Sequence, residues 1–187
     1  MLYISKGIPL WRPAGEAVSV SHCGKLHQLD GIQGRLWLDG QYQPARIQTP
    51  DQMIELERLS GLGIVSCSDG EEGVTLFRLL VNCAICPFHA KHSFTLLSPS
   101  ERRLLRWIRR AGLRLTIAEL TLLAERGVKP APALLGEENR QTLTETIYSP
   151  ETIGDNILES LMEHSPAQAD TVRAVFGLLR KKKIFLL

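Results

Sequence analysis

Apolar and polar positions alternate in short stretches at the beginning of the chain, and this pattern predicts strands before any helix. Turn-forming residues separate the stretches. The strands are expected at residues 3–5, 17–21 and 25–29. Ile32, Leu36 and Trp37 then recur at helical spacing, so a short helix should follow and end at Gly40.

A second helix is clearer, because its first turn carries residues that begin helices. Thr49 is a typical N-cap and Pro50 suits the first helical position. The side chains expected to face the core are Met53, Ile54, Leu56 and Leu59. Residues 64–67 and 74–81 then flank a stretch rich in Asp, Glu and Gly, which is typical of a β-hairpin. Helix, short loop, helix and hairpin is the element order of a winged helix.

From residue 98 onward the pattern becomes helical. The expected helices span 98–111 and 116–126, begin after Ser149 and after Ser165, and precede a terminal strand at 183–187. Thr116 and Glu119 have the spacing of a capping box. The first helix should bury Leu104, Trp107, Ile108 and Ala111. The third should bury Ile153, Ile157, Leu158, Leu161 and Met162, and the fourth Val172, Val175, Phe176 and Leu179.

These elements predict an α+β fold made of two small winged-helix-like modules, in which helices combine with short antiparallel strands and hairpins. Residues 1–90 should form a module with N-terminal strands, and residues 91–187 a mainly helical one. The boundary is expected between Cys86 and Leu97, where a proline coincides with the change of pattern. A hydrophobic fraction of 44% suffices for a buried core, and 22% charged residues spread along the chain argue against disorder.

Several classes of protein are disfavoured by what the sequence lacks. No apolar run reaches the roughly 20 residues that span a bilayer, and the N-terminus does not resemble a signal peptide. We therefore expect a cytoplasmic protein with no membrane partner and with reduced cysteines. There is no glycine-rich phosphate loop, nucleophile elbow or metalloprotease motif, and the neighbouring Cys23 and His22 are a weak signal, so we expect no enzyme.

Charge is distributed unevenly, although the formal net charge is only +2. Residues 1–92 carry −1 and residues 93–187 carry +3. The arginines at 102, 106 and 109 form one stripe of the expected helix, and arginine fits phosphate through its planar fork of donors. The candidate nucleic-acid contacts are Arg102, Arg103, Arg106, Arg109, Arg110, Lys181 and Lys182. In the alternative, the arginines pair with Glu151, Asp155, Glu159 and Glu163.

A cluster of thiols and imidazoles suggests a metal site. Cys83, Cys86, His89 and His92 are each separated by two residues, and tetrahedral zinc takes four such ligands. The same thiols with Cys67 or Cys23 could instead hold an iron–sulfur cluster. In the alternative, which requires no cofactor, Cys83 packs as a small apolar residue and the histidines lie in an exposed linker.

The first module resembles the small winged-helix domains of the PqqD family, which recognise precursor peptides. The resemblance covers about a third of the chain and rests on residues 16–20, 25–30, 34–40 and 56–65. The family usually has Asn where this chain has Asp30. In such domains the peptide adds as a strand at a sheet edge, and the resemblance implies that Val18, Ser19 and Val20 would receive it. The whole plan also resembles tandem winged-helix regulators of transcription.

Our leading hypothesis is therefore a non-enzymatic tandem winged-helix protein that binds DNA and regulates transcription. The alternative is an adaptor that binds a protein or peptide, as an accessory subunit of a larger complex or of a peptide-modification system. The near-neutral charge weakens the DNA hypothesis, because DNA-binding domains are usually more basic. A metal-dependent sensor is a third hypothesis, and the sequence leaves a homodimer open.

Overall fold

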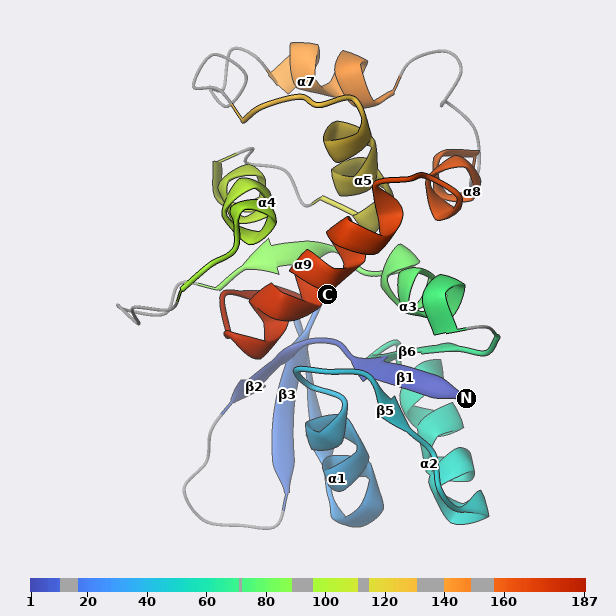
Figure 1. Ribbon diagram of the computed structural model, residues 1–187. Helices are drawn as coiled ribbons and strands as arrows, with labels where there is room; N and C mark the ends of the chain where they lie inside the picture. The colour runs from blue at the N-terminus through green and yellow to red at the C-terminus, as the bar shows by residue number, and fades with distance from the viewer. Residues whose placement is uncertain (11–16, 71, 89–95, 111–114, 131–139, 149–156) are drawn as a thin grey trace. The chain divides into compact units, whose positions relative to one another are not determined.

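The computed structural model describes residues 1–10, 17–70, 72–88, 96–110, 115–130, 140–148 and 157–187. The chain is an α+β protein whose helices accompany small antiparallel sheets (Figure 1). It divides into two compact units. Unit 1 comprises Met1–Cys83 with Phe185–Leu187, and unit 2 comprises Ala84–Ile184.

Unit 1 contains two three-stranded antiparallel sheets. In the first sheet β1 (Leu2–Ser5) lies between β5 (Ala45–Arg46) and β6 (Val65–Ser68). In the second sheet β3 (Val18–His22) lies between β2 (Ile8–Leu10) and β4 (Lys25–Leu29). The three predicted strands are confirmed as β1, β3 and β4, whereas β2 and β5 were not predicted.

A tight turn joins β3 to β4. Cys23 and Gly24 both have positive φ, 48° and 79°, as the two central residues of a type I′ turn require. His22 pairs with Lys25 on either side of the turn, and Val20 pairs with His27 further along. The two-residue turn therefore fixes the register of the hairpin.

Three helices of unit 1 are α1 (Gly31–Asp39), α2 (Pro50–Gly61) and α3 (Glu72–Val81). The predictions of α1 and α2 are confirmed, and Thr49 forms a full capping box with Gln52. Two hydrogen bonds fasten α1 to the chain around β1. Ser5 Oγ donates to the Trp37 carbonyl oxygen at 2.7 Å, and Trp37 Nε1 donates to the Lys6 carbonyl oxygen at 3.0 Å.

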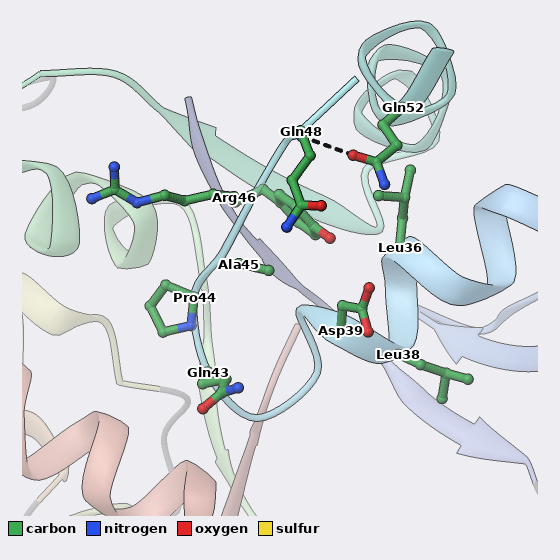
Figure 2. Close-up of a pocket in the computed structure, with 10 residues that line it drawn as sticks. Leu36, Leu38, Asp39, Gln43, Pro44, Ala45, Arg46, Gln48 and Gln52 are labelled. Carbon is green, nitrogen blue, oxygen red and sulfur yellow. Dashed lines mark hydrogen bonds between the residues drawn. The ribbon is translucent and has the colours of Figure 1, made fainter. Parts of the chain in front are cut away.

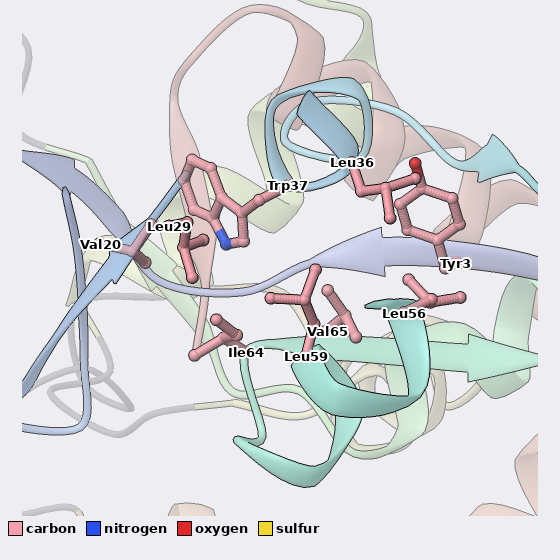
Figure 3. Packing of buried hydrophobic residues seen from close by; sticks show 9 residues of the cluster. All are labelled: Tyr3, Val20, Leu29, Leu36, Trp37, Leu56, Leu59, Ile64 and Val65. Atoms are coloured by element: carbon pink, nitrogen blue, oxygen red, sulfur yellow. The ribbon is translucent and has the colours of Figure 1, made fainter. Parts of the chain in front are cut away.

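The core of unit 1 forms where α1 and α2 meet the two sheets. Figure 3 shows the cluster, which consists of Tyr3, Val20, Leu29, Leu36, Trp37, Leu56, Leu59, Ile64 and Val65. Burial of these side chains is the main force that holds the sheets and helices together. The predicted core faces were too broad, because Ile32 and Ile54 are exposed.

The hairpin predicted from residues 64–67 and 74–81 is wrong in its second half. The first stretch forms β6, but the second lies in α3, which packs against β6 and β1. Phe77, Leu79 and Leu80 are all buried, so the helix is apolar on more than one side. A short apolar run without alternation fits a buried helix as well as a strand. These residues therefore do not form the expected wing.

Unit 2 is mainly helical. Its described helices are α4 (Pro99–Arg110), α5 (Ile117–Glu125), α7 (Arg140–Ile147), α8 (Ile157–Glu163) and α9 (Gln168–Arg180). The third sheet has two strands, β7 (Ile85–Pro87) and β8 (Ile184–Leu186), and the last two residues of β8 count with unit 1. α9 packs against both α4 and α5, and α8 packs against α5. The core of unit 2 therefore lies around α9 and α5.

Most helix predictions for this unit are confirmed. Thr116 and Glu119 form the expected capping box, and the predicted inner face of α9 is buried. In α8, Leu158 and Met162 are buried but Ile157 and Leu161 are exposed, so the predicted apolar face was too broad. The beginning of that helix and Ala111 lie outside the described residues. α7 was not predicted. Within the described part of the chain, no helix has the length and apolar character needed to cross a bilayer.

Candidate functional site

The helix α4 has two chemically opposite faces. Leu104, Trp107 and Ile108 are each 2% exposed or less. Arg102, Arg106 and Arg109 are exposed on the other side, and Arg103 is half-buried. The side chain of Arg110 is not among those described. Helical periodicity thus buries one face and leaves a stripe of guanidinium groups in solvent.

None of the four described arginines of α4 forms an ion pair with another residue that the structure describes. Among the described residues, Glu159 makes no ion pair with an arginine of α4, and the helix that carries it, α8, packs against α5. Glu151 and Asp155 lie outside the described residues.

Lys181 was predicted to contact phosphate, but in the structure it contacts a carboxylate of the protein itself. Its Nζ lies 2.7 and 2.6 Å from the two carboxylate oxygens of Glu101 and donates to the Leu96 carbonyl oxygen at 2.9 Å. Glu101 is only 5% exposed. Its carboxylate lies against Gly177 of α9, where any side chain would collide with it. Lys181 therefore neutralises a buried carboxylate at the beginning of α4.

The pKa of Glu101 reflects this arrangement. Burial raises the pKa, but hydrogen bonds from Lys181 and from the Ser98 backbone, together with the positive charge of Lys181, outweigh burial and hold it below its usual value. Lys182 follows on the turn after α9, where it is exposed with a φ of 53°. Because Lys181 contacts Glu101, this basic turn lies beside the beginning of α4.

The strand-addition site predicted at Val18, Ser19 and Val20 has no free edge. These residues lie in β3, which pairs with β2 on one side and with β4 on the other. Both edges of β3 are occupied within its own sheet. The edge strand next to it is β4, where Leu26 is 54% exposed.

The cysteines show no assembled metal site in the described residues. Cys83 is buried, its thiol lies 3.3 Å from the Leu79 carbonyl oxygen, and burial raises its pKa to about 12. Metal binding requires the thiolate. Cys86 is also buried, and His89 and His92 lie outside the described residues. No three His, Cys, Asp or Glu side chains in the described ranges come together as metal ligands.

The thiol–imidazole neighbours at the β3–β4 turn are in contact but isolated. Cys23 Sγ lies 3.6 Å from His22 Nε2. Burial, Lys6 and His27 lower the pKa of His22, which favours the neutral imidazole. Catalytic thiols usually have a third group that orients the base, and no hydrogen bond to His22 from another described residue supplies one.

A cleft in unit 1 was missed by the sequence analysis. It has a volume of about 430 Å³ and lies between α1, β5 and the beginning of α2 (Figure 2). Its polar lining residues include Tyr3, Asp39, Gln43, Gln48 and Gln52. Three glutamines within ten residues were the only local signal, and the lining is assembled from four separate elements.

Comparison of the chain with protein families, with curated proteins and with solved structures gives no match.

Proposed function

We propose that the chain is a non-enzymatic DNA-binding protein that acts in transcriptional regulation and contacts the phosphate backbone through the exposed face of α4. The observation that carries the proposal is the stripe formed by Arg102, Arg106 and Arg109, which are exposed and lack an ion-pair partner among the described residues. Guanidinium groups bind phosphate oxygens with two parallel hydrogen bonds.

The length of the stripe matches a short run of phosphates. Seven residues separate Arg102 from Arg109, which corresponds to about 10.5 Å at about 1.5 Å rise per residue. One DNA strand carries a phosphate about every 3.4 Å of helix axis, so the stripe can span about three phosphates. The buried Leu104, Trp107 and Ile108 hold the helix in place, so the arginines do not have to be ordered on a flexible segment.

Such a contact predicts weak binding with a defined salt dependence. Phosphate contacts release counterions, and three contacts give a slope of about −2.7 in a plot of log affinity against log salt. The near-neutral net charge of +2 adds little further attraction. We therefore expect binding that is measurable at low salt and falls steeply towards physiological salt.

The test is fluorescence anisotropy of a short labelled DNA duplex over a salt series. Replacing Arg102, Arg106 and Arg109 with Ala should abolish most of the binding and flatten the slope by about one unit for each lost contact. Alanine favours helix, and circular dichroism verifies that the variant is folded. The matched control removes as many positive charges elsewhere, by Ala substitution of the exposed Lys25, Arg35 and Lys129.

The control should bind as the parent protein does. An equal loss of DNA affinity in both variants would show that only the net charge of the protein matters, and it would contradict a specific role of α4. A parent protein that shows no affinity for the duplex at low salt would overturn the DNA-binding proposal.

A second candidate function is an adaptor that binds an extended peptide at the edge of β4. The pair that flanks a two-residue turn is hydrogen-bonded, and such pairs recur at every second position. His22–Lys25 and Val20–His27 are therefore bonded pairs, and the backbone groups of Leu26 and Gln28 point away from β3. Both residues are exposed, so an incoming strand would find free donors and acceptors.

This second candidate is tested with peptides selected from a displayed random library. Leu26→Pro removes one outward N–H without removing a hydrogen bond to β3, and an edge strand tolerates proline. It should weaken peptide binding strongly, whereas Leu26→Thr retains the N–H and should bind. Selected peptides that bind equally to both variants would exclude the edge of β4, and DNA binding should be unaffected by either change.

A further inference from the structure

The cleft beside β5 presents polar groups of unit 1 that neither proposed function uses. Its volume of about 430 Å³ falls within the usual range for small-molecule sites, about 300–1,000 Å³. Figure 2 shows Asp39, at the end of α1, facing the same space as Gln48 and Gln52 around the beginning of α2. Leu36 and Ala45 line the space between these polar groups.

Asp39 supplies an uncompensated negative charge to the cleft. Its carboxylate forms no ion pair or hydrogen bond with any residue in the described ranges. Arg46 also lines the cleft, but its side chain runs away from Asp39 on the far side of Ala45 (Figure 2). The charge of Asp39 also acts on the buried Tyr3. Burial, and to a smaller extent Asp39, raise the pKa of the Tyr3 hydroxyl to about 12. An arriving cation would therefore meet Asp39 without displacing a resident partner.

Gln52 supplies a donor of fixed orientation. Its side-chain oxygen accepts from the backbone N–H groups of Gln48 and Thr49, at 2.8 and 3.3 Å. Both bonds belong to the network that begins α2, so they determine which end of the amide carries the nitrogen. The Nε2 group makes no hydrogen bond to another described residue. It remains available to an acceptor on a ligand.

We propose that this cleft binds a small primary amine that also carries a hydroxyl or carbonyl oxygen. The ammonium group donates to the Asp39 carboxylate, and the ligand oxygen accepts a hydrogen bond from Gln52 Nε2. Charge-assisted hydrogen bonds of the first kind are the stronger ones and provide most of the affinity. The second bond distinguishes such ligands from simple alkylamines. The site shares no residue with the DNA contact, because its residues all belong to unit 1 and α4 belongs to unit 2.

The binding test is an NMR titration of the full chain with ethanolamine, with ethylamine and with ethylene glycol, which lacks the charge. We expect ethanolamine to shift the amide signals of Ala45, Gln48 and Gln52 with saturation in the millimolar range. Ethylene glycol should cause no saturable shift. Asp39→Asn should weaken ethanolamine binding about tenfold, as expected when a hydrogen bond to a charged group is lost. The matched control is Glu57→Gln, an exposed carboxylate of α2 outside the lining, which should leave binding unchanged.

A second variant tests the role of Gln52 without disturbing α2. Gln52→Glu retains an oxygen that can complete the capping box, but it has no Nε2 donor. The probe for this variant is 2-methoxyethylamine, whose ether oxygen accepts a hydrogen bond but cannot donate one to a carboxylate. It should bind the parent protein more tightly than ethylamine does, and this advantage should disappear in the variant. The proposal is overturned if no saturable shift appears at these amides, or if Asp39→Asn binds as the parent does. If the parent binds the two amines with equal affinity, the proposed hydrogen bond between Gln52 Nε2 and the ligand oxygen is wrong.

Discussion

The beginnings of α4 and α5 share one local motif but differ in what stabilises their buried acids. In each, a hydroxyl residue accepts from the backbone of a glutamate three positions later, and that glutamate accepts from the hydroxyl residue's own backbone N–H. Glu101 and Glu119 are both buried. Glu101 is neutralised by Lys181, whereas Glu119 accepts a hydrogen bond from the Tyr148 hydroxyl. The same local motif therefore begins both helices, with a charged partner for the glutamate in α4 and a neutral partner in α5.

The charged and the neutral partner should contribute differently to the free energy of unfolding. Removing one member of a buried ion pair leaves a charge without compensation, whereas removing a neutral donor costs a single hydrogen bond. The two helix starts should therefore respond unequally to loss of their partners.

The largest effect is expected from Lys181→Met, which retains much of the side-chain length and removes the charge. It leaves the Glu101 carboxylate buried with only the hydrogen bonds from Ser98, and we expect a loss of about 2 kcal/mol in the free energy of unfolding, below the full cost of a deeply buried pair. Urea denaturation followed by circular dichroism measures it. The neighbouring exposed cation gives the control, since Arg180→Met should change stability little.

Adding Glu101→Gln to Lys181→Met should recover part of that loss, because glutamine still completes the capping box. A double variant no more stable than Lys181→Met alone would show that the Glu101 charge is not the source of the cost.

A smaller effect on stability is expected from lowering the pH. The pKa of Glu101 is lower in the folded protein than its ordinary value, so its contribution to stability is present above the unfolded pKa and is lost as pH falls through the folded pKa. Denaturation midpoints should therefore fall below about pH 4, near the ordinary pKa of a glutamate. In Glu101→Gln this part of the decline should be missing. Identical acid profiles for the parent and this variant would contradict the assignment.

The smallest effect is expected from Tyr148→Phe at the beginning of α5. The change removes the hydroxyl that donates to Glu119, but Glu119 keeps its bond from the Thr116 backbone. We expect a loss of about 1 kcal/mol, as for one partly exposed hydrogen bond from a neutral donor to a carboxylate. A loss as large as that of Lys181→Met would remove the distinction between the two helix starts.

The comparison also separates what the sequence could predict from what it could not. Both helix starts were predicted, because Thr116 and Glu119, like Ser98 and Glu101, interact within a single turn. Their tertiary partners were not, because Lys181 and Tyr148 are distant in sequence and nothing local marks them. Lys181 was instead assigned to phosphate, since a basic run is equally compatible with a ligand and with an internal acid.

The same reasoning explains the other outcomes. Periodicity predicted α4 well, because its apolar residues lie on one face and most of its arginines on the other. It failed for α3, where Phe77, Leu79 and Leu80 are all buried. The cleft at Asp39 could not be predicted, because its lining depends on how β1, α1, β5 and α2 pack together.

The last strand has a consequence for how the protein folds during synthesis. Residues 185–187 belong to unit 1, and the backbone N–H of Gly7 donates to the Leu186 carbonyl oxygen at 2.7 Å. N-terminal domains commonly fold while the ribosome is still translating the remainder. Here, unit 1 cannot complete its hydrogen bonding until residue 186 has left the exit tunnel. Contacts between residues so far apart in sequence raise the contact order and slow folding. Unit 1 of the nascent chain therefore remains incompletely folded while unit 2 is being translated.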